Sequence, residues 1–487
     1  MRYNIPTRPL ATDDATQMRL EHTALRKRML VGQWILDLED ELARHLPADR
    51  RESWGPADLS SNPFEQITGQ LAVLYNQAPV VTNNEGDIEA LTGRNGYVTK
   101  AGLWPLMQRG QEFTIGLREC GVMVTVVPHH KSEYIGERGL QYRIVTPDNM
   151  LAYAHPDYPD KPVKVLEMRL RLDPLTQEHK WIGDLYDITN LNEPKYGMYE
   201  LNKDGTIGND VSALYMGHDA MVGEAYPFRY GTGELFIPLT LYHAEKTGEL
   251  FNAFDGSTSV YGSLNCGVLF SMWLHLVRDS AWSQKYILGA GIAGLNAMSG
   301  DSTARRAAIA TDPSSILMLM SDPDAQGQPM VGTFEPPVSP NDLLEAITKY
   351  EVRVATSAGV SPDSITRKNA DPRSGYALSI DKAGQRAAQR KYAPTQRIGD
   401  EELLGKSAAL ANRYLGTSLP ESGYRIMYQS VGMSPDELKA QREDIIEKLK
   451  AGLISPIMAV QELNPDLDMQ GAADLLRQIR RERAEFL

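Results

Sequence analysis

The chain has few of the residues that form disulfides or bind metals. Cys120 and Cys266 are its only cysteines in 487 residues, so neither a disulfide framework nor a four-thiolate metal site is possible. The adjacent His129 and His130 would point to opposite faces of a strand and could not readily chelate one metal ion together. We therefore expect a protein of a reducing compartment that has no metal site.

Long apolar segments are also missing. The N-terminal sequence MRYNIPTRPLATDD has no apolar core of the kind found in signal peptides. The most apolar run, residues 267–277, stops at Arg278 and Asp279 and falls short of the roughly 20 residues that cross a bilayer. The sequence predicts a soluble, cytoplasmic chain with no membrane partner.

Positive charge is in deficit. The chain has 50 Lys and Arg against 63 Asp and Glu, a net charge of −13, which argues against a protein that coats itself with nucleic acid through bulk charge. Local basic surfaces remain compatible with this balance. The apolar share of 42% and the charged share of 23% are those of an ordinary globular chain, and the length suffices for about three domains.

One glycine-rich string suggests nucleotide chemistry. Gly289, Gly291 and Gly294 form a G-x-G-x-x-G, whose glycines would let the backbone approach a pyrophosphate. The preceding residues, however, predict a helix that continues to Leu288 in place of the required strand, and the helix that should follow is broken at Gly300. We favour a Gly/Ala hinge and keep dinucleotide binding as an alternative.

A second string, from Gly399 to Ser407, resembles a P-loop. It has five residues between its glycines where the motif needs four, and Asp400, Glu401 and Glu402 would repel phosphates. We therefore expect a helical surface turn. Nucleophile-elbow and zinc-protease motifs do not occur in the sequence. The sequence thus gives no positive sign of an enzyme, and we assign neither a catalytic residue nor a cofactor.

Periodicity in the first half predicts helices followed by a sheet. Apolar residues at helical spacing predict a helix over 17–46 and a second helical block over 64–75. The period then changes to two. Residues 121–127 form a β-rich run, and residues 166–172 alternate apolar with charged side chains, which predicts a strand with one wet face. Residues 202–205 are typical of a hairpin turn. We therefore expect this middle segment to form an antiparallel sheet.

The second half is again mostly helical. Residues 263–288 are an apolar-dense helix candidate, and residues 341–358 are another. A strand over 315–320 lies in the insert between them. A helix, a β-containing insert and a returning helix form a hairpin that projects its insert away from the body. Further helical stretches follow over 377–415.

The C-terminal region has the clearest local signals. Ser434 is an N-cap, Pro435 occupies the first helical position and Glu437 lies three residues after the cap. Gly452 supplies a stop for this helix, and Ser455, which precedes a proline, starts another. Together with the sheet predicted above, these helices indicate the α+β fold class.

One local segment is basic. Between residues 361 and 395, seven basic residues outnumber three acidic ones, for a local charge of +4. A solvated helix face with salt bridges would explain this charge. The sharper hypothesis is that Arg367, Lys368, Asn369 and Arg373 lie in a loop that faces a polyanion. These residues have no aromatic partners for base stacking, so the contact would be with phosphates.

Taken in order, these segments resemble the portal, or head-to-tail connector, proteins of tailed bacteriophages. The resemblance covers nearly the whole chain as a pattern of segments. The strings that carry it are residues 62–81, 254–256, 358–362, 375–386 and 450–455. The missing ATP motif fits this family, because its packaging motor resides on a separate terminase.

The resemblance implies an α+β subunit with a helical stem hairpin, an antiparallel β wing, a small α/β clip and a helical C-terminal crown, assembled as a ring that is typically a dodecamer. The implied segments are an N-terminal arm (1–20), wing (21–256), first stem helix (257–288), clip (289–340), second stem helix (341–360), channel loop (361–376), long wing helices (377–431) and crown (432–487).

The resemblance also implies partners. The clip would bind the terminase large subunit during packaging and a head-to-tail adaptor afterwards, through Arg305, Arg306, Asp322 and Asp324. Contacts between stem helices of neighbouring subunits would use Phe270, Trp273, Leu274 and Trp282. Double-stranded DNA would pass the channel loop without sequence-specific contacts. Major capsid and scaffolding proteins would surround the ring, at the portal vertex of a virion assembled in the host cytoplasm.

Two rival functions stay open. The first is a flavin- or nicotinamide-dependent oxidoreductase built around residues 289–294. The second is a phage structural protein that makes no contact with DNA. Rings with a central hole would distinguish a portal from both.

Overall fold

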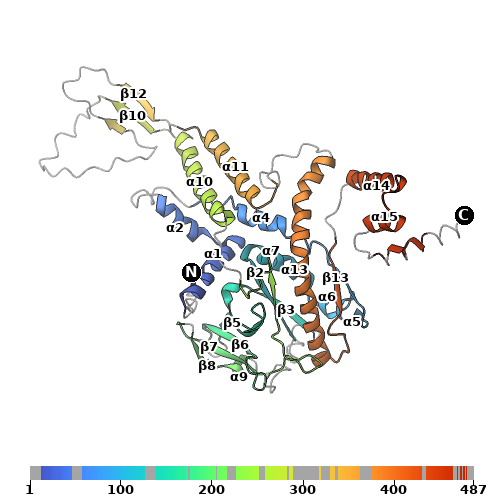
Figure 1. Cartoon of the computed structure of the whole chain (residues 1–487). Helices are drawn as coiled ribbons and strands as arrows, with labels where there is room; N and C mark the ends of the chain where they lie inside the picture. Colours follow the sequence, from blue (N-terminus) through green and yellow to red (C-terminus); the bar gives the residue numbers. More distant parts are fainter. Residues whose placement is uncertain are drawn as a thin grey trace. The chain divides into compact units, whose positions relative to one another are not determined.

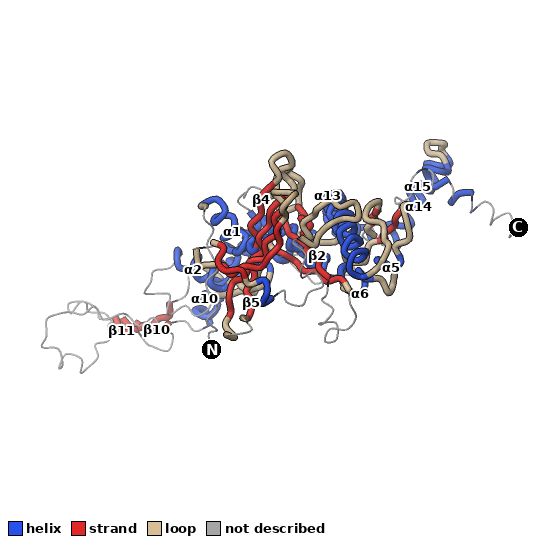
Figure 2. Tube along the Cα trace, turned by 90° about the horizontal axis from the view of Figure 1, so that it is seen from below, coloured by secondary structure: helices blue, strands red, loops and turns tan. Residues whose placement is uncertain are grey.

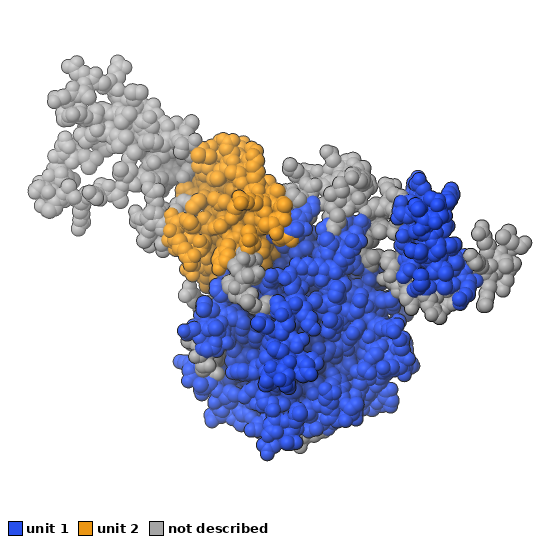
Figure 3. All heavy atoms as spheres, in the orientation of Figure 1, with its two compact units in different colours: residues 1–31, 65–255, 359–487 blue, residues 32–64, 256–358 orange. Residues whose placement is uncertain are grey.

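The structure is a computed structural model, in which the chain divides into two compact units. Unit 1 comprises residues 1–31, 65–255 and 359–487, and unit 2 comprises residues 32–64 and 256–358 (Figure 3). The described residues are 13–45, 57–126, 139–173, 176–204, 206–215, 226–251, 258–281, 284–288, 317–319, 330–334, 338–361, 375–429, 435–463, 469, 472–473, 475–477 and 479. Helices and mainly antiparallel sheets confirm the α+β class. The division into eight segments stays a prediction.

A three-stranded antiparallel sheet lies at the centre of unit 1. Strand β2 (Glu119–Val126) pairs with β3 (Leu140–Val145) on one side and with β9 (Leu239–His243) on the other. Helices α7 (Leu103–Leu117) and α13 (Gly375–Leu415) both contact β2 (Figure 1). Because β2 is buried along nearly its whole length, it is apolar without alternation, as residues 121–127 predicted.

The second sheet of unit 1 is a five-stranded meander, in which each strand is antiparallel to the next. Two of its strands, β4 and β5, are labelled among the red strands of Figure 2. Its strands are β4 (Met150–Ala154), β5 (Pro162–Leu172), β6 (His179–Asp187), β7 (Lys195–Leu201) and β8 (Ile207–Asp210). The predicted turn between β7 and β8 is confirmed: the Asn202 N–H donates to the Thr206 carbonyl at 3.0 Å. The sequence therefore predicted antiparallel pairing correctly but not the division into two sheets.

Smaller elements complete unit 1. Strand β1 (Val80–Asn83) pairs antiparallel with β13 (Tyr424–Met427). The remaining elements are α1 (Asp14–Leu30), α5 (Glu89–Thr92), α6 (Tyr97–Lys100), η2 (Pro147–Asn149), α9 (Ser212–Tyr215), α14 (Pro435–Lys450) and α15 (Pro456–Leu463). Helix α4 (Pro63–Leu71) begins in unit 2 and continues into unit 1.

Unit 2 is built on two antiparallel helices, α10 (Thr258–Ala281) and α11 (Pro340–Ser357). As residue numbers rise along α10, those of the facing residues on α11 fall: Gly262 lies against Val354, the Asn265 amide donates to Tyr350 Oη, and Trp273 Nε1–H donates to the Pro340 carbonyl. The structure therefore confirms the predicted returning helix.

Helix α2 (Ile35–His45) packs on α10 within unit 2. Gly267 is the close contact: a Cβ there would lie 2.9 Å from the Trp34 ring and 3.0 Å from Leu38. The backbone N–H groups of Asp58 and Phe64 donate to Ser271 Oγ and Ser263 Oγ. Two serine side chains on this apolar helix thus anchor the segment before α4 and the first turn of α4.

The predicted helix over 263–288 is wrong at its C-terminal end. Helix α10 ends at Ala281, and Gln284–Leu288 form strand β10. Strand β10 pairs antiparallel with β12 (Met330–Phe334) and parallel with β11 (Leu317–Leu319). The apolar Tyr-Ile-Leu run fits a central strand as well as a helix, and long-range pairing with both neighbours decides for the strand.

The predicted helix over 17–46 is also wrong, because it is two helices. Helix α1 ends at Leu30, where the Val31 N–H closes the last turn on the Lys27 carbonyl. Gly32 follows with a φ of +71°, which glycine adopts without steric cost. The apolar spacing continues across this break, so periodicity alone did not reveal it.

The C-terminal signals are confirmed where the structure describes them. Helix α14 begins at Pro435 and its last turn ends at Gly452, which has a φ of +70°. The Met458 N–H donates to Ser455 Oγ at the start of α15. The string from Gly399 to Ser407 is helical as predicted, but it lies inside α13 with Leu403 and Ser407 fully buried, so the expected surface turn is wrong.

By length and composition, α10 could cross a membrane, which corrects the expectation drawn from its shorter apolar run. Part of its surface is buried within unit 2, against α2 and α11.

The approach of α10 to α11 generates a stability prediction. A Cβ at Gly262 would lie 2.6 Å from Val354 Cγ2, and a valine in a helix strongly prefers one χ1 rotamer, so turning that methyl away is unfavourable. We expect Gly262→Val to destabilise unit 2 by about 1–3 kcal/mol through overpacking, measured by urea unfolding. Ser280→Ala, on the exposed end of the same helix, is the control and should change little. Equal stability of the two variants would contradict the close approach.

Candidate functional site

Most of the residues that the sequence analysis singled out lie outside the described residues. These are Arg367, Lys368, Asn369 and Arg373 of the expected channel loop, Arg305, Arg306, Asp322 and Asp324 of the expected clip, and Trp282 of the expected stem. Phe270, Trp273 and Leu274 are described, on α10.

The three described stem residues differ in their surroundings. Phe270 and Trp273 meet edge to face, with ring centroids 6.3 Å apart, and both are half-buried. The indole N–H of Trp273 donates a hydrogen bond to the Pro340 carbonyl within the pair of helices α10 and α11. Leu274 is 49% exposed. Leu274 is thus the most available of the three for contact with another molecule.

The basic segment continues into the first turns of α13. Four of its basic residues lie in the described helix: Lys382, Arg386, Arg390 and Lys391. Lys391 pairs at 2.6 Å with Glu245, which follows β9 and lies outside the 361–395 window. Glu245 therefore compensates one positive charge of the basic segment, and the sequence alone did not predict that Glu245 lies beside Lys391.

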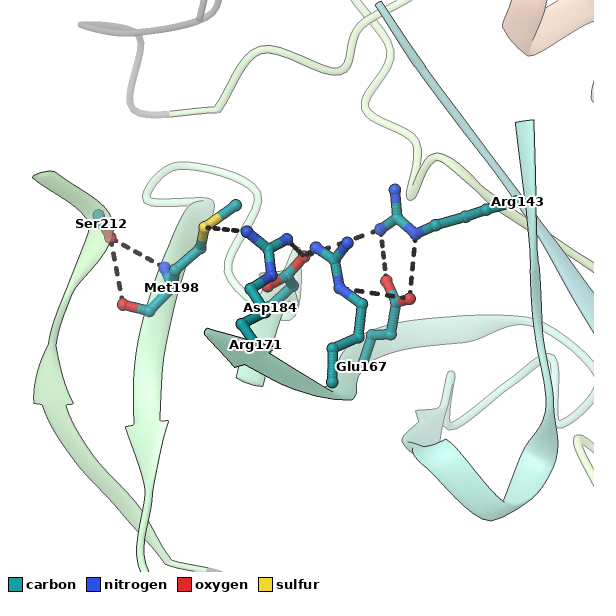
Figure 4. Close-up of polar contacts among 7 residues, drawn as sticks. Arg143, Glu167, Arg171, Asp184, Met198 and Ser212 are labelled. Carbon is teal, nitrogen blue, oxygen red and sulfur yellow. Dashed lines mark hydrogen bonds and ion pairs between the residues drawn. The ribbon is translucent and has the colours of Figure 1, made fainter. Parts of the chain in front are cut away.

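The sequence analysis missed the densest charge cluster of the described residues, which lies on β5 and its neighbours (Figure 4). Glu167 on β5 and Asp184 on β6 are directly paired in the register, so their side chains share one face of the sheet. Both carboxylates are buried. Two like charges in such positions repel each other and require cations nearby.

Three arginines supply those cations, and we call the five residues the arginine–carboxylate cluster. Arg143 on β3 donates its Nε to Glu167 Oε1 at 3.0 Å and a terminal nitrogen to the other oxygen, a bidentate geometry. Arg169 and Arg171 both approach Asp184 Oδ2. Asp184 Oδ1 is buried and has no hydrogen-bond partner among the described residues.

Burial and the charges within the cluster shift the pKa values of its members. Burial works against ionisation of Glu167, but the charge and hydrogen bonds of Arg143 outweigh it, so the pKa of Glu167 lies below its usual range. Burial, reinforced by repulsion from Arg143, lowers the pKa of Arg169 to about 10. The lowered pKa keeps Glu167 ionised at neutral pH, and Arg143 binds both oxygens of this carboxylate.

The predicted wet face of residues 166–172 is therefore wrong. Arg169 and Arg171 on that face are only partly exposed, and Glu167 is buried. The opposite face carries Leu166 and Met168, which are also buried. Alternation of charged and apolar residues indicated the strand, but the compensating arginine comes from a different sheet, and no pattern within the strand could predict it.

The glycine string at 289–294 lies outside the described residues, but what precedes it is described. Strand β10 ends at Leu288, so a strand does lead into Gly289. The objection that a helix precedes the glycines is therefore wrong. The parallel partner β11 and the antiparallel partner β12 make a sheet of three described strands, and residues 289–316, between β10 and β11, lie outside the described residues.

Among the described residues, no group of three or more His, Cys, Asp or Glu side chains could hold a metal ion. No protein-family model matches the chain, and no curated protein matches it.

The arginine–carboxylate cluster generates a coupling prediction. Glu167→Leu or Arg143→Met alone should lower the free energy of unfolding by on the order of 3 kcal/mol, because each leaves a largely buried charge without its bidentate partner. The double variant should lose at least about 1 kcal/mol less than the sum of the single losses.

The measurement is a double-mutant cycle by urea unfolding. The matched control is the exposed pair Lys439 and Glu443 on α14, whose atoms are 3.9 Å apart and whose removal should leave the unfolding midpoint unchanged. Additive losses at Arg143 and Glu167 would contradict the coupling.

Proposed function

We propose that this chain is a portal protein, which forms a ring at one capsid vertex through which double-stranded DNA enters and leaves. The observation that carries the proposal is the order of elements in unit 2 and beyond it. The antiparallel helices α10 and α11 have a small sheet inserted between them, and the polar segment 362–374 then leads into the 41-residue helix α13. This order matches the stem, clip, stem and channel loop of portals.

Connectivity supports a projecting insert. Trp273 contacts Pro340, so the C-terminal part of α10 and the start of α11 lie together at one end of the hairpin. The strands β10, β11 and β12 are connected to the chain at this end. A clip that extends from a stem in this way could bind a terminase large subunit and later an adaptor, for which we propose Arg305, Arg306, Asp322 and Asp324.

A ring requires two different complementary surfaces on each subunit. The exposed Leu274 and the half-buried Phe270 on α10 supply apolar area for one of them. Tyr261, on the same helix, is 46% exposed. We propose that α10 packs against a neighbouring subunit through these side chains, with Trp273 and Trp282 contributing to the same surface.

The charge balance suits a channel that DNA must traverse. The net charge of −13 disfavours tight adhesion, while a few basic residues repeated around a ring give weak, salt-dependent contacts with phosphates. We propose that Arg367, Lys368, Asn369 and Arg373 make these contacts. The protein would then act without catalysis, beside major capsid and scaffolding proteins at the portal vertex of the virion, after assembly in the host cytoplasm.

The ring is the first testable consequence. We expect the purified chain to have a mass many times its 54.1 kDa subunit mass, about twelvefold, and to appear in negative-stain images as an annulus with a central hole. Mass photometry at several concentrations measures the first, and class averages measure the second. A chain that remains monomeric at high concentration would exclude a portal.

DNA contact is the second consequence. In particles assembled with the variant Arg367→Ala, Lys368→Ala, Arg373→Ala, we expect rings to form but the amount of retained DNA to change, because three cations per subunit are lost from the channel. The control replaces the exposed Lys439 and Lys450 of α14 with Ala and should leave DNA retention unchanged. Normal packaging by the triple variant would instead favour a phage structural protein without DNA contact.

One observation favours a second candidate, a flavin- or nicotinamide-dependent oxidoreductase. Strand β10 leads directly into Gly289 and has the parallel partner β11, as in a dinucleotide-binding unit. An absorbance spectrum of the purified protein tests for bound flavin. Titration with a nicotinamide dinucleotide, followed by calorimetry, tests for the second cofactor. Binding of either would favour the oxidoreductase over the portal.

A further inference from the structure

A buried carboxylate in the middle of α13 is held by hydroxyl groups in place of cations. Asp400 is 1% exposed, and none of the ion pairs among the described residues involves it. Its two oxygens accept hydrogen bonds from three tyrosines: Tyr75 at 2.9 Å to both, Tyr242 at 3.0 Å to Oδ1 and Tyr428 at 2.7 Å to Oδ2. We call these four residues the tyrosine–carboxylate cluster.

The cluster joins four segments that are far apart in sequence. Tyr75 follows α4, Tyr242 lies on β9, Tyr428 directly follows β13, and Asp400 lies on α13. Tyr75 and Tyr428 also meet edge to face, with centroids 5.5 Å apart. Strand β13, which pairs with β1, is thereby fixed to α13 through the hydroxyl of Tyr428.

The surroundings disfavour a charged carboxyl. Besides the tyrosines, the ionisable neighbours on α13 are Glu401, which adds negative charge, and Glu402, whose charge is paired with Lys406. Arg397, also on α13, donates its Nε to the carbonyl of Ile426. Burial raises the pKa of Asp400 to about 7, against the three hydroxyl donors that lower it. The same burial, with the charge of Asp400, raises the pKa values of Tyr75 and Tyr242, so these remain neutral donors.

We propose that the tyrosine–carboxylate cluster is a proton-linked latch, which holds β13 and Tyr428 to α13 more tightly when Asp400 carries a proton than when it is ionised. This inference is independent of the proposed portal function. It concerns how firmly β13, which precedes the C-terminal helices α14 and α15, is attached to the rest of unit 1.

A rearrangement of hydrogen bonds accompanies the proton. When the carboxyl takes up one proton from solvent, the new O–H must donate to an oxygen that previously donated to it. Tyr75 Oη can accept this bond, because its own proton can turn to Gln396 Oε1, 3.4 Å away. The neutral cluster therefore keeps its hydrogen bonds without burying a charge.

The sign of the pH dependence follows from linkage. With the latch open, Asp400 meets water and has an ordinary pKa of about 3.9. The closed state, with a pKa of about 7, binds the proton more strongly. Opening therefore becomes more frequent as pH rises between these values, by up to about tenfold per pH unit, and levels off above about pH 7.

Hydrogen–deuterium exchange of the intact protein, followed by mass spectrometry, tests the latch. In the peptide that contains Tyr424–Met427, the opening constant, corrected for the intrinsic pH dependence of exchange, should rise by roughly fiftyfold between about pH 5 and about pH 7. Asp400→Asn should abolish this rise. The exposed Asp87→Asn should leave it unchanged. The same slope in Asp400→Asn and in the wild type would overturn the proposal.

A second measurement distinguishes a latch from a merely structural cluster. The infrared carbonyl band of a neutral carboxyl group should appear as pH falls through about 7 in the wild type. Tyr428→Phe removes a donor to the charged form, so it should move the midpoint to higher pH. Tyr242→Phe should do the same and replaces Tyr428→Phe if that variant does not fold. A midpoint near the ordinary value of about 4, or one that neither substitution moves, would overturn the proposal.

Discussion

The close approach of α13 to the strands around it is the constraint on which unit 1 depends. Two glycines make it possible. A Cβ at Gly399 would lie 2.5 Å from the ring of Tyr242, and one at Gly405 would lie 2.6 Å from the backbone oxygen of Glu421. Contacts this short place Asp400, next to Gly399, within hydrogen-bond distance of Tyr242. The packing that builds the core is thus also what buries a carboxyl group in it.

Elements decided by one local residue type could be predicted from the sequence. Proline at the first position of α14 and glycine at 452 define that helix, because each restricts the backbone of its own residue. Similarly, the Asn202 turn and the apolar run of β2 need no distant partner to be recognised. The returning helix α11 could also be predicted from its own residues, through the helical spacing of its apolar side chains.

Elements decided by distant partners could not be predicted. Strand β10 forms because β12 and β11 pair with it, and its own residues suit a helix equally well. Glu167 looked solvated because Arg143, which compensates it, lies on a different sheet. Within the candidate site, the sequence predicted the basic segment 361–395 but not the position of Glu245 beside Lys391.

The two buried carboxylate clusters of unit 1 respond to acid in opposite directions, because their compensating groups differ. Arg143 stabilises the ionised form of Glu167, so the stability that Glu167 contributes is present above its unfolded pKa and is lost as pH falls through its lowered folded pKa. Asp400 has no ion-pair partner among the described residues and burial raises its pKa, so its contribution is fully present below the unfolded pKa and is lost as pH rises through the folded pKa of about 7. From these two clusters alone, unit 1 is most stable on the acid side of neutrality. The stability of unit 1 therefore has two pH limits: the contribution of Glu167 is lost in acid, and the contribution of Asp400 is lost as pH rises to about 7.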